Sequence, residues 1–449
     1  MTDAATEDAP EAPGGRLAAF RHGSFVLYFA ARVLTTFGAQ ILSVAVIWHI
    51  YAITKSALFT GLVGLVQFLP LALLVLVTGT AADQFGRRLI MGISIVLAAA
   101  CAVAMALLTA LGIITPFLML SILVVFGVAR AFLGPASSSL VVSLVPTRDF
   151  ANAVTWNSSA WQAATIVGPA AGGLLLGLGE RPFTNWLANA GQPQLAGLID
   201  GHGPEVAYIT GFVFMMLGAL FVFAIPKPPK SPPRERPTLS NMLDGFRFIW
   251  KQKIILGAIS LDLFAVLMGG VVALLPVYAE DILHLGPEGL GWLRAAPGIG
   301  AILVAILIAV FPIRDHAGKI MFACVAMFGV FTVIFGLSTV AWLSITALIL
   351  LGAADMVSVV VRETLLQLWT PDDVRGRVNA VNSVFVSASN ELGEFRAGTM
   401  AHAIGPAAIG AVPAVVIGGI GAIGVAAIWA WIFPQLRKAR SLTGRDGEV

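Results

Sequence analysis

The sequence predicts an all-α membrane protein with twelve transmembrane helices in two pseudo-symmetric bundles of six. Of its 449 residues, 58% are hydrophobic and only 11% are charged, whereas a soluble domain carries about 25% charged residues. Two runs, 89–129 and 320–354, contain no Asp, Glu, Lys or Arg. A membrane span needs about 20 apolar residues, so each run is long enough for two spans. Helices are expected because the backbone in lipid must satisfy its own hydrogen bonds.

The expected spans follow from hydropathy and from the turn residues between apolar runs. They cover residues 25–52, 58–80, 89–111, 117–144, 150–178, 206–225, 254–279, 289–312, 319–337, 341–369, 376–402 and 412–433. This gives bundles at 25–225 and 254–434, a linker at 226–253, and polar tails at 1–24 and 435–449. Proline and charge keep the linker extended in water. Its end, 239–253, has Leu243, Phe246 and Trp250 at helical spacing, which predicts a short surface helix.

Basic residues predict the orientation of the spans. With the amino terminus inside, the inner loops and tails hold twenty Lys and Arg, and the outer loops hold two, Lys55 and Arg181. Basic residues concentrate in cytoplasmic loops. We therefore expect both termini to be cytoplasmic. The even number of spans agrees, because one miscounted span would mix the two sets.

The chain repeats itself at a nearly constant offset. Three pairs of segments match: Gly64 and Pro70 with Gly291 and Pro297, Asp83, Gly86 and Arg87 with Asp315, Gly318 and Lys319, and 126–130 with 351–355. The offsets are 227, 232 and 225 residues. Three matches in the same order indicate a duplication of six spans. Transporters built from parallel repeats bind their substrates near the bilayer midplane.

One polar stretch stands between two uncharged runs, at 79–88. It contains Gly79, Asp83, Gly86, Arg87 and Arg88. This pattern resembles the signature between spans 2 and 3 of the major facilitator superfamily. The resemblance extends over nearly the whole chain. It implies that Asp83 with Arg87 and Arg88 forms a latch between helices on the cytoplasmic side. Anchoring by the two Arg alone is the simpler alternative, which leaves Asp83 and Gly86 without a role.

A second element lies in the fifth span. Gly168, Pro169, Gly172 and Gly173 resemble a motif of the proton-coupled exporters in this superfamily. The stretch 375–381 resembles the bacterial group of enterobactin and macrolide exporters. The alternative reading is close helix packing, which small residues permit without any further role.

Four charges within the spans form a pattern. Arg32 and Asp262 match at an offset of 230, and Arg130 and Asp355 match at 225. The resemblance places spans 1, 4, 7 and 10 around a central cavity, and all four residues fall on those spans. Charged groups at membrane depth mark function by default. We expect Asp262 and Asp355 to exchange protons, and static ion pairs are the alternative.

Other polar residues in the spans have simpler expectations. Glu391 and Glu394 share a helix face at i and i+3 and are expected to join an ion network. Arg294, Arg362 and Glu363 lie towards the ends of their spans, so their side chains are expected to reach water. On span 5, we expect Asn157, Trp161 and Gln162 either to contact a ligand or to pack.

These patterns predict a secondary transporter that exports an amphiphilic small molecule in exchange for protons. An importer of the same fold is the alternative. An ATP-driven pump is disfavoured because Ile320 follows Gly318 and Lys319 where a phosphate loop needs Ser or Thr. An enzyme would need Glu391, Glu394 and His402 as a metal cluster, and no Glu-x-x-His pairing is present. A transporter-like sensor is a third class.

The expected surroundings of the chain follow from the same reading. We expect a monomer in the bacterial cytoplasmic membrane, and the expected partners are protons, a small-molecule substrate and the lipid bilayer. We expect no cofactor, no metal and no nucleic-acid partner.

Overall fold

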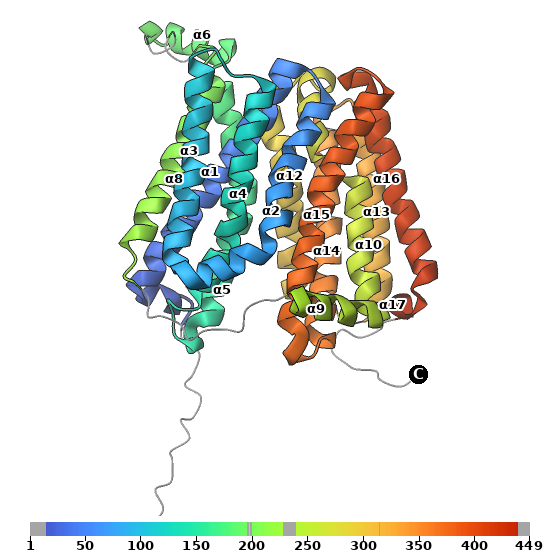
Figure 1. Ribbon diagram of the computed structural model, residues 1–449. Helices are drawn as coiled ribbons and strands as arrows, with labels where there is room; N and C mark the ends of the chain where they lie inside the picture. The colour runs from blue at the N-terminus through green and yellow to red at the C-terminus, as the bar shows by residue number, and fades with distance from the viewer. Residues whose placement is uncertain (1–14, 195–196, 198–199, 228–238, 314, 439–449) are drawn as a thin grey trace, which may run out of the picture.

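The computed structural model describes residues 15–194, 197, 200–227, 239–313 and 315–438. The chain forms two helical halves that stand side by side (Figure 1). We call the face where α1 begins and α16 ends the terminal face, and the opposite one the distal face. Both described ends of the chain lie at the terminal face (Figure 1).

Six long helices make the first half: α1 (Gly23–Thr54), α2 (Ala57–Phe85), α3 (Arg87–Ala110), α4 (Pro116–Val141), α5 (Thr147–Gly177) and α8 (Gly203–Ala224). Helix α1 packs on α5 and α8, and α4 packs on α2 and α3. A short helix, α6 (Arg181–Asn189), follows α5 at the distal face and lies across the bundle direction (Figure 1).

The second half has the same plan with one irregular helix. Its helices are α10 (Lys253–Gly269), α12 (Gly286–Val310), α13 (Ala317–Leu337), α14 (Ala341–Trp369), α15 (Asp372–Ile404) and α16 (Ala407–Ile432). The span predicted at 254–279 is interrupted at Gly269 and Gly270. It continues as the short elements η2 (Val272–Leu274), α11 (Leu275–Val277) and η3 (Tyr278–Ile282), the last a π-helical turn. The other predicted spans each correspond to one long helix, which confirms the twelve-helix prediction.

Ten of the described helical segments are long and apolar enough to cross a membrane. Helices α5 and α15 are not among the ten. Both carry many polar residues on the part nearer the terminal face, such as Asn152 and Asn157 on α5 and Asn379 and Asn382 on α15. They match the fifth spans of the two halves, so the polarity is duplicated with the fold.

Three short helices lie at the terminal face. They are η1 (Ala18–Arg21), within the predicted tail, α9 (Leu239–Lys251) and α17 (Pro434–Lys438). Helix α9 packs on α15 and buries Ile249. The predicted apolar stripe is only partly covered, since Phe246 and Trp250 are exposed, although the centre of the Phe246 ring lies 6.5 Å from that of Phe385 on α15. The Leu243 side chain lies outside the described residues.

The two halves meet through α5 against α12 and through α2 against α15. Glycines bring the backbones together near the distal face. A Cβ atom on Gly173 of α5 would lie 2.7 Å from the Pro287 oxygen and 2.8 Å from Gly291 Cα of α12. A Cβ atom on Gly61 of α2 would lie 3.1 Å from Gly398 Cα of α15. Nearer the terminal face the halves spread apart (Figure 1).

Both contacts repeat through the duplication. Gly168 and Gly173 on α5 recur as Gly393 and Gly398 on α15, at an offset of 225. The first glycine of each pair packs within its own half, Gly168 on α1 and Gly393 on α10. The second glycine of each pair packs on the other half. The fifth long helix of each half, α5 or α15, therefore joins its own half to the other half.

Gly173→Ala should weaken the contact at the distal face. The added methyl meets backbone atoms, which a side-chain rotation cannot relieve, so we expect a penalty of about 2 kcal/mol on the closed state. This corresponds to a roughly 30-fold change in the ratio of closed to open molecules. Spin labels at Ile113 and Val340, exposed on opposite halves of this face, measure it in a background without Cys101 and Cys324.

The matched control is Gly424→Ala on α16, where a Cβ atom meets nothing within 4 Å. We expect the control to keep the wild-type distance distribution. An unchanged distribution for Gly173→Ala would show that this contact does not hold the face closed.

Candidate functional site

A cavity of about 350 Å³ lies where the two halves face each other. Helices α1, α2, α4 and α5 supply its wall from the first half, and α12 and α15 supply the wall from the second. It is lined by Arg32, Thr35, Thr36, Ala39, Gln40, Ser43, Ile47, Val63, Gly64, Gln67, Phe126, Arg130, Leu133, Gly134, Trp161, Arg294, Glu391 and Glu394. Its volume is typical of small-molecule sites.

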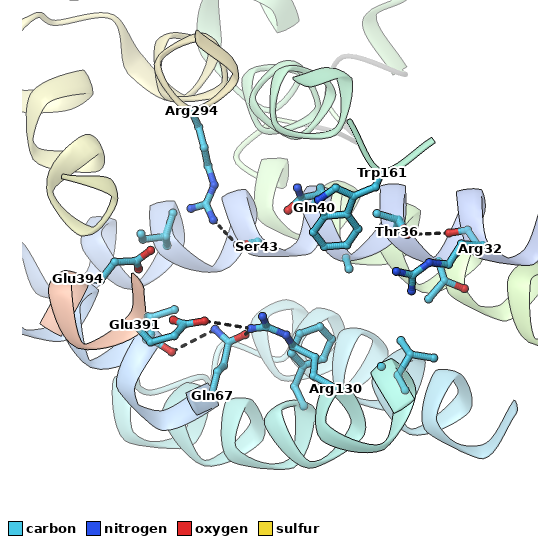
Figure 2. Close-up of a pocket in the computed structure, with 18 residues that line it drawn as sticks. Arg32, Thr36, Gln40, Ser43, Gln67, Arg130, Trp161, Arg294, Glu391 and Glu394 are labelled. Atoms are coloured by element: carbon cyan, nitrogen blue, oxygen red, sulfur yellow. Dashed lines mark hydrogen bonds and ion pairs between the residues drawn. The ribbon is translucent and has the colours of Figure 1, made fainter. Parts of the chain in front are cut away.

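An ion pair crosses the cavity between the halves. The Nη1 atom of Arg130 on α4 lies 3.5 Å from Oε1 of Glu391 on α15. The same nitrogen donates a hydrogen bond to Gln67 Oε1 on α2, at 2.9 Å. Figure 2 shows Arg130, Gln67 and Glu391 converging. Gly64 makes room for them, because a Cβ atom there would lie 2.7 Å from Glu391 Oε2.

A second contact between the halves involves Arg294. Its Nη2 atom, from α12, donates a hydrogen bond to Ser43 Oγ on α1 at 2.8 Å (Figure 2). Glu394 lies one turn along α15 from Glu391 and lines the same cavity. The expectation that Arg294 reaches water at the end of its span is wrong. The repeat contains a signal for this position, because Arg294 matches Gln67 at the offset of 227, and both residues line the cavity.

The remaining cavity cation, Arg32, lies nearer the terminal face on α1. Its guanidinium carbon is 5.6 Å from the centre of the Trp161 ring on α5. Trp161 was expected either to contact a ligand or to pack, and the structure places it on the cavity wall. The cavity therefore has one zone with arginines and carboxylates and another with an arginine and an aromatic ring.

The four charges expected to share one site are divided between two places. Arg32 and Arg130 line the cavity, and Asp262 and Asp355 are not among its lining residues. Asp262 forms an ion pair with Arg362 inside the second half, between α10 and α14. Asp355 is half-buried on α14, near enough to both to interact electrostatically.

The cluster around Asp262 corrects the expectation for Arg362. Its side chain does not reach water at the end of the span, because residue Arg362 is only 3% exposed and Asp262 only 6%. Glu363 lies 3.7 Å from Arg362 Nη2 and accepts a hydrogen bond from Asn382 on α15 at 3.0 Å. One guanidinium is thus buried among three carboxylates, if Asp355 is included.

The polar stretch at 79–88 covers the end of α2 and the start of α3. Gly86 alone separates these helices and has φ of +91°, which favours glycine. Arg87 donates to the Ser139 oxygen on α4 at 3.0 Å. Arg88 donates to the carbonyls of Val222 and Phe223, which end α8. Cations suit a helix carboxyl end.

These contacts of Arg87 and Arg88 tie α3 to the first half. The side chain of Asp83 and the surroundings of Gly79 lie outside the described residues. The latch between helices therefore stays a prediction.

The element at Gly168, Pro169, Gly172 and Gly173 lies where α5 crosses α1 and α12. A Cβ atom on Gly172 would lie 3.3 Å from Ile41 Cα on α1. The Pro169 carbonyl faces Gly291 on α12, at 2.8 Å from the Cβ position of that glycine. The element is thus packed at a junction of both halves, which is compatible with either reading of its role.

Acidic residues from both halves meet at the distal face. Lys55, after α1, lies 3.3 Å from Glu280 on η3, and Tyr51 donates to Asp281. Glu180, after α5, retains exposed surface. Partial desolvation, and then the charges of Glu280 and Glu288, raise the pKa of its carboxyl above the ordinary 4.5. Within the described residues, no three His, Cys, Asp or Glu side chains are grouped as metal ligands.

Comparison with known proteins gives consistent matches. The Major Facilitator Superfamily model matches residues 28–319. The multidrug efflux pump Tap of Mycobacterium tuberculosis is 27% identical over 400 residues, which cover 86% of this chain and 88% of the pump. The enterobactin exporter EntS of Escherichia coli O1:K1 is 26% identical over 370 residues, covering 80% and 81%.

Solved structures share the fold. A bacterial homologue of the human lysosomal transporter Spinster, in an inward-facing and unoccupied conformation, has a TM-score of 0.73 at 16% identity. The match covers 94% of this chain and 99% of that one. A D-xylose–proton symporter has a TM-score of 0.65 at 15% identity, covering 91% and 97%.

The raised pKa of Glu180 predicts a pH dependence of the distal face. Opening this face separates Glu180 from Glu280 and Glu288, so its pKa falls towards 4.5. The closed state then holds the proton more tightly, and its advantage is lost as pH rises through the raised pKa. We expect a larger closed fraction at about pH 5 than at about pH 8, and a weaker dependence in Glu180→Gln. The labels at Ile113 and Val340 measure it, and equal dependence in both proteins would contradict it.

Asp262→Asn should destabilise the second half. The change removes the buried ion-pair partner of Arg362 and leaves only the half-exposed Glu363, which costs about 3 kcal/mol. Thermal unfolding of the purified protein in detergent measures the loss. The matched control is Glu363→Gln, since the Glu363 side chain is 40% exposed and should matter little. Arg362→Gln in the Asp262→Asn background should restore part of the stability, and an unchanged melting temperature for Asp262→Asn would refute the assignment.

Proposed function

The chain belongs to the major facilitator superfamily, and we propose that it exports an amphiphilic small molecule in exchange for protons by alternating access. It is a transporter of the membrane, with homologues that are efflux pumps. The proposal adds a direction, a coupling ion and a substrate class.

The observation that carries the proposal is the ion pair between Arg130 and Glu391. It joins α4 of the first half to α15 of the second. The halves must separate at the distal face for substrate to leave there, and this pair must then break. The hydrogen bond from Arg294 to Ser43 also joins the two halves and must break in the same step. Substrate, protons and the change of conformation therefore meet in one cavity.

Protons enter the cycle by competing with Arg130. A proton on Glu391 removes the charge that Arg130 pairs with, and a re-formed pair releases the proton. A proton taken up while the distal side is open would thus leave once the halves close there and Arg130 returns. Glu394, on the same helix face, is the second candidate acid.

Asp262 and Asp355 remain the alternative coupling groups. They lie inside the second half with Arg362, so they would act through the packing of α10 against α14. The cavity acids are favoured because they contact both the opposite half and the substrate space. The two assignments differ in which variants lose coupling.

Two observations support a cytoplasmic terminal face towards which the halves open, and the named relatives support the outward direction. The halves spread apart towards the terminal face (Figure 1), and the basic residues concentrate there, which is typical of a cytoplasmic face. Substrate would then load from the cytoplasm. The named relatives are an efflux pump and an exporter.

An amphiphilic substrate fits the composition of the wall. Ile47, Val63, Phe126 and Leu133 provide apolar surface beside the charged and amide side chains. Ten of the eighteen lining residues are polar or charged, and such groups fix the orientation of a bound ligand.

Glu391→Gln and Glu394→Gln should each reduce proton-driven transport at least roughly tenfold while substrate binding persists. Substrate is found first by comparing small molecules in medium and cytoplasm of cells with and without the gene. Enterobactin and a macrolide antibiotic serve as initial probes. Uptake is then measured in everted vesicles with an acidic lumen.

Glu205→Gln on α8, outside the cavity lining, is the matched control and should transport normally. Loss of coupling in Asp355→Asn with full activity in both cavity variants would assign the protons to the second half. Accumulation only in right-side-out vesicles with acid outside would show an importer and overturn the direction.

A further inference from the structure

The charges of the cavity do not balance near its terminal side. Three arginines and two glutamates line it. Arg130 pairs with Glu391, and both Arg130 and Arg294 interact electrostatically with Glu394. Arg32 has no carboxylate partner among the residues that the structure describes. A cation in a partly dehydrated cavity calls for a counter-charge.

Distance separates Arg32 from the carboxylates. It lies eleven residues before Ser43 on α1, which is about 16 Å along the helix, and Ser43 marks the level of Arg294. Figure 2 shows Arg32 and Glu394 at opposite ends of the view. The positive charge of Arg32 is therefore available to a ligand.

An aromatic surface accompanies this charge. Trp161 is 48% exposed and has the Arg32 guanidinium 5.6 Å from its ring centre. The amide of Gln40 lies beside the ring (Figure 2), and it has no hydrogen-bond partner among the described side chains. Gly168 of α5 packs closely on the Gln40 side chain, since a Cβ atom added to Gly168 would lie 2.5 Å from Gln40 Cβ. The crossing of α1 and α5 therefore holds the Gln40 side chain in place.

We infer that Arg32, Trp161 and Gln40 form a binding subsite for an acidic group attached to a planar ring. The acid, a carboxylate or an ionised phenol, pairs with Arg32, the ring packs on Trp161, and the Gln40 amide bonds to a ring substituent. The subsite rests on the proposed transport function and names the substrate class. A cationic amphiphile is disfavoured, because it would approach Arg32 first and would then compete with two arginines for Glu394.

The test compares three probes of similar size and different charge. They are 4-octylbenzoate, 4-octylbenzamide and 4-octylbenzylammonium, titrated calorimetrically into the protein in nanodiscs of neutral phosphatidylcholine, with empty nanodiscs subtracted. We expect the benzoate to bind roughly tenfold more tightly than the benzamide, since a hydrogen bond to a charged group is worth about that much. The ammonium probe should bind most weakly.

Variants assign the preference to the subsite. Arg32→Gln should remove the difference between benzoate and benzamide by weakening only the benzoate. Arg32→Lys should keep part of it, since the charge remains and the planar fork is lost. Trp161→Ala should weaken both probes equally. Arg21→Gln, in η1 and outside the cavity, is the control and should bind as wild type.

Equal binding of benzoate and benzamide to the wild type would overturn the inference. So would an unchanged preference in Arg32→Gln, or tightest binding of the ammonium probe. If Arg32→Gln does not fold, the wild-type comparison and Arg32→Lys still decide. These outcomes are independent of the vesicle experiment. If the benzoate preference is absent but proton-driven export is intact, the subsite is wrong and the proposed function stands. If export is absent but the benzoate preference is intact, the proposed function is wrong and the subsite stands.

Discussion

The requirement that a charge at membrane depth have a compensating partner determines much of this structure. Asp262 and Arg362 lie in different helices and are both buried, so α10 and α14 must pack at one register. Arg130 and Glu391 lie in different halves, so their pairing helps to fix how the halves meet in this structure. The same electrostatic demand thus acts both inside the second half and between the two halves.

The duplication explains the architecture, and differences between its copies explain the chemistry. Gly173 and Gly398 keep the same task in α5 and α15, the close contact with the other half. Gln67 and Arg294 are also repeat partners, yet one is neutral and the other charged. Arg130 and Asp355 have opposite charges. A symmetrical scaffold thus carries an asymmetrical cavity, in which the two halves contact each other through unlike side chains.

The sequence predicts the helices well because uncharged runs are a property of each span alone. It also finds Arg32 and Arg130, because the repeat aligns them. It misplaces Arg362, whose partner Asp262 lies 100 residues earlier and becomes visible only in the packed fold. It expects Glu391 and Glu394 to join an ion network, and Glu391 does pair with Arg130, but the identity of that partner depends on how Gly61 and Gly64 of α2 pack against α15. It also misses the break at Gly269, since hydropathy does not register helix geometry.

The polarity of α5 and α15 has a consequence for the biosynthesis of the protein. Neither helix belongs to the segments apolar enough to cross a membrane by composition, and α15 carries Glu391, Glu394 and Arg396 at membrane depth. The cost of inserting such charges is several kcal/mol for α15 alone. We therefore expect α15 to enter the bilayer together with neighbouring helices that cover its polar face. The charged groups of the cavity wall thereby make the insertion of α15 depend on helices that come earlier in the chain, α2 and α10, which pack against it.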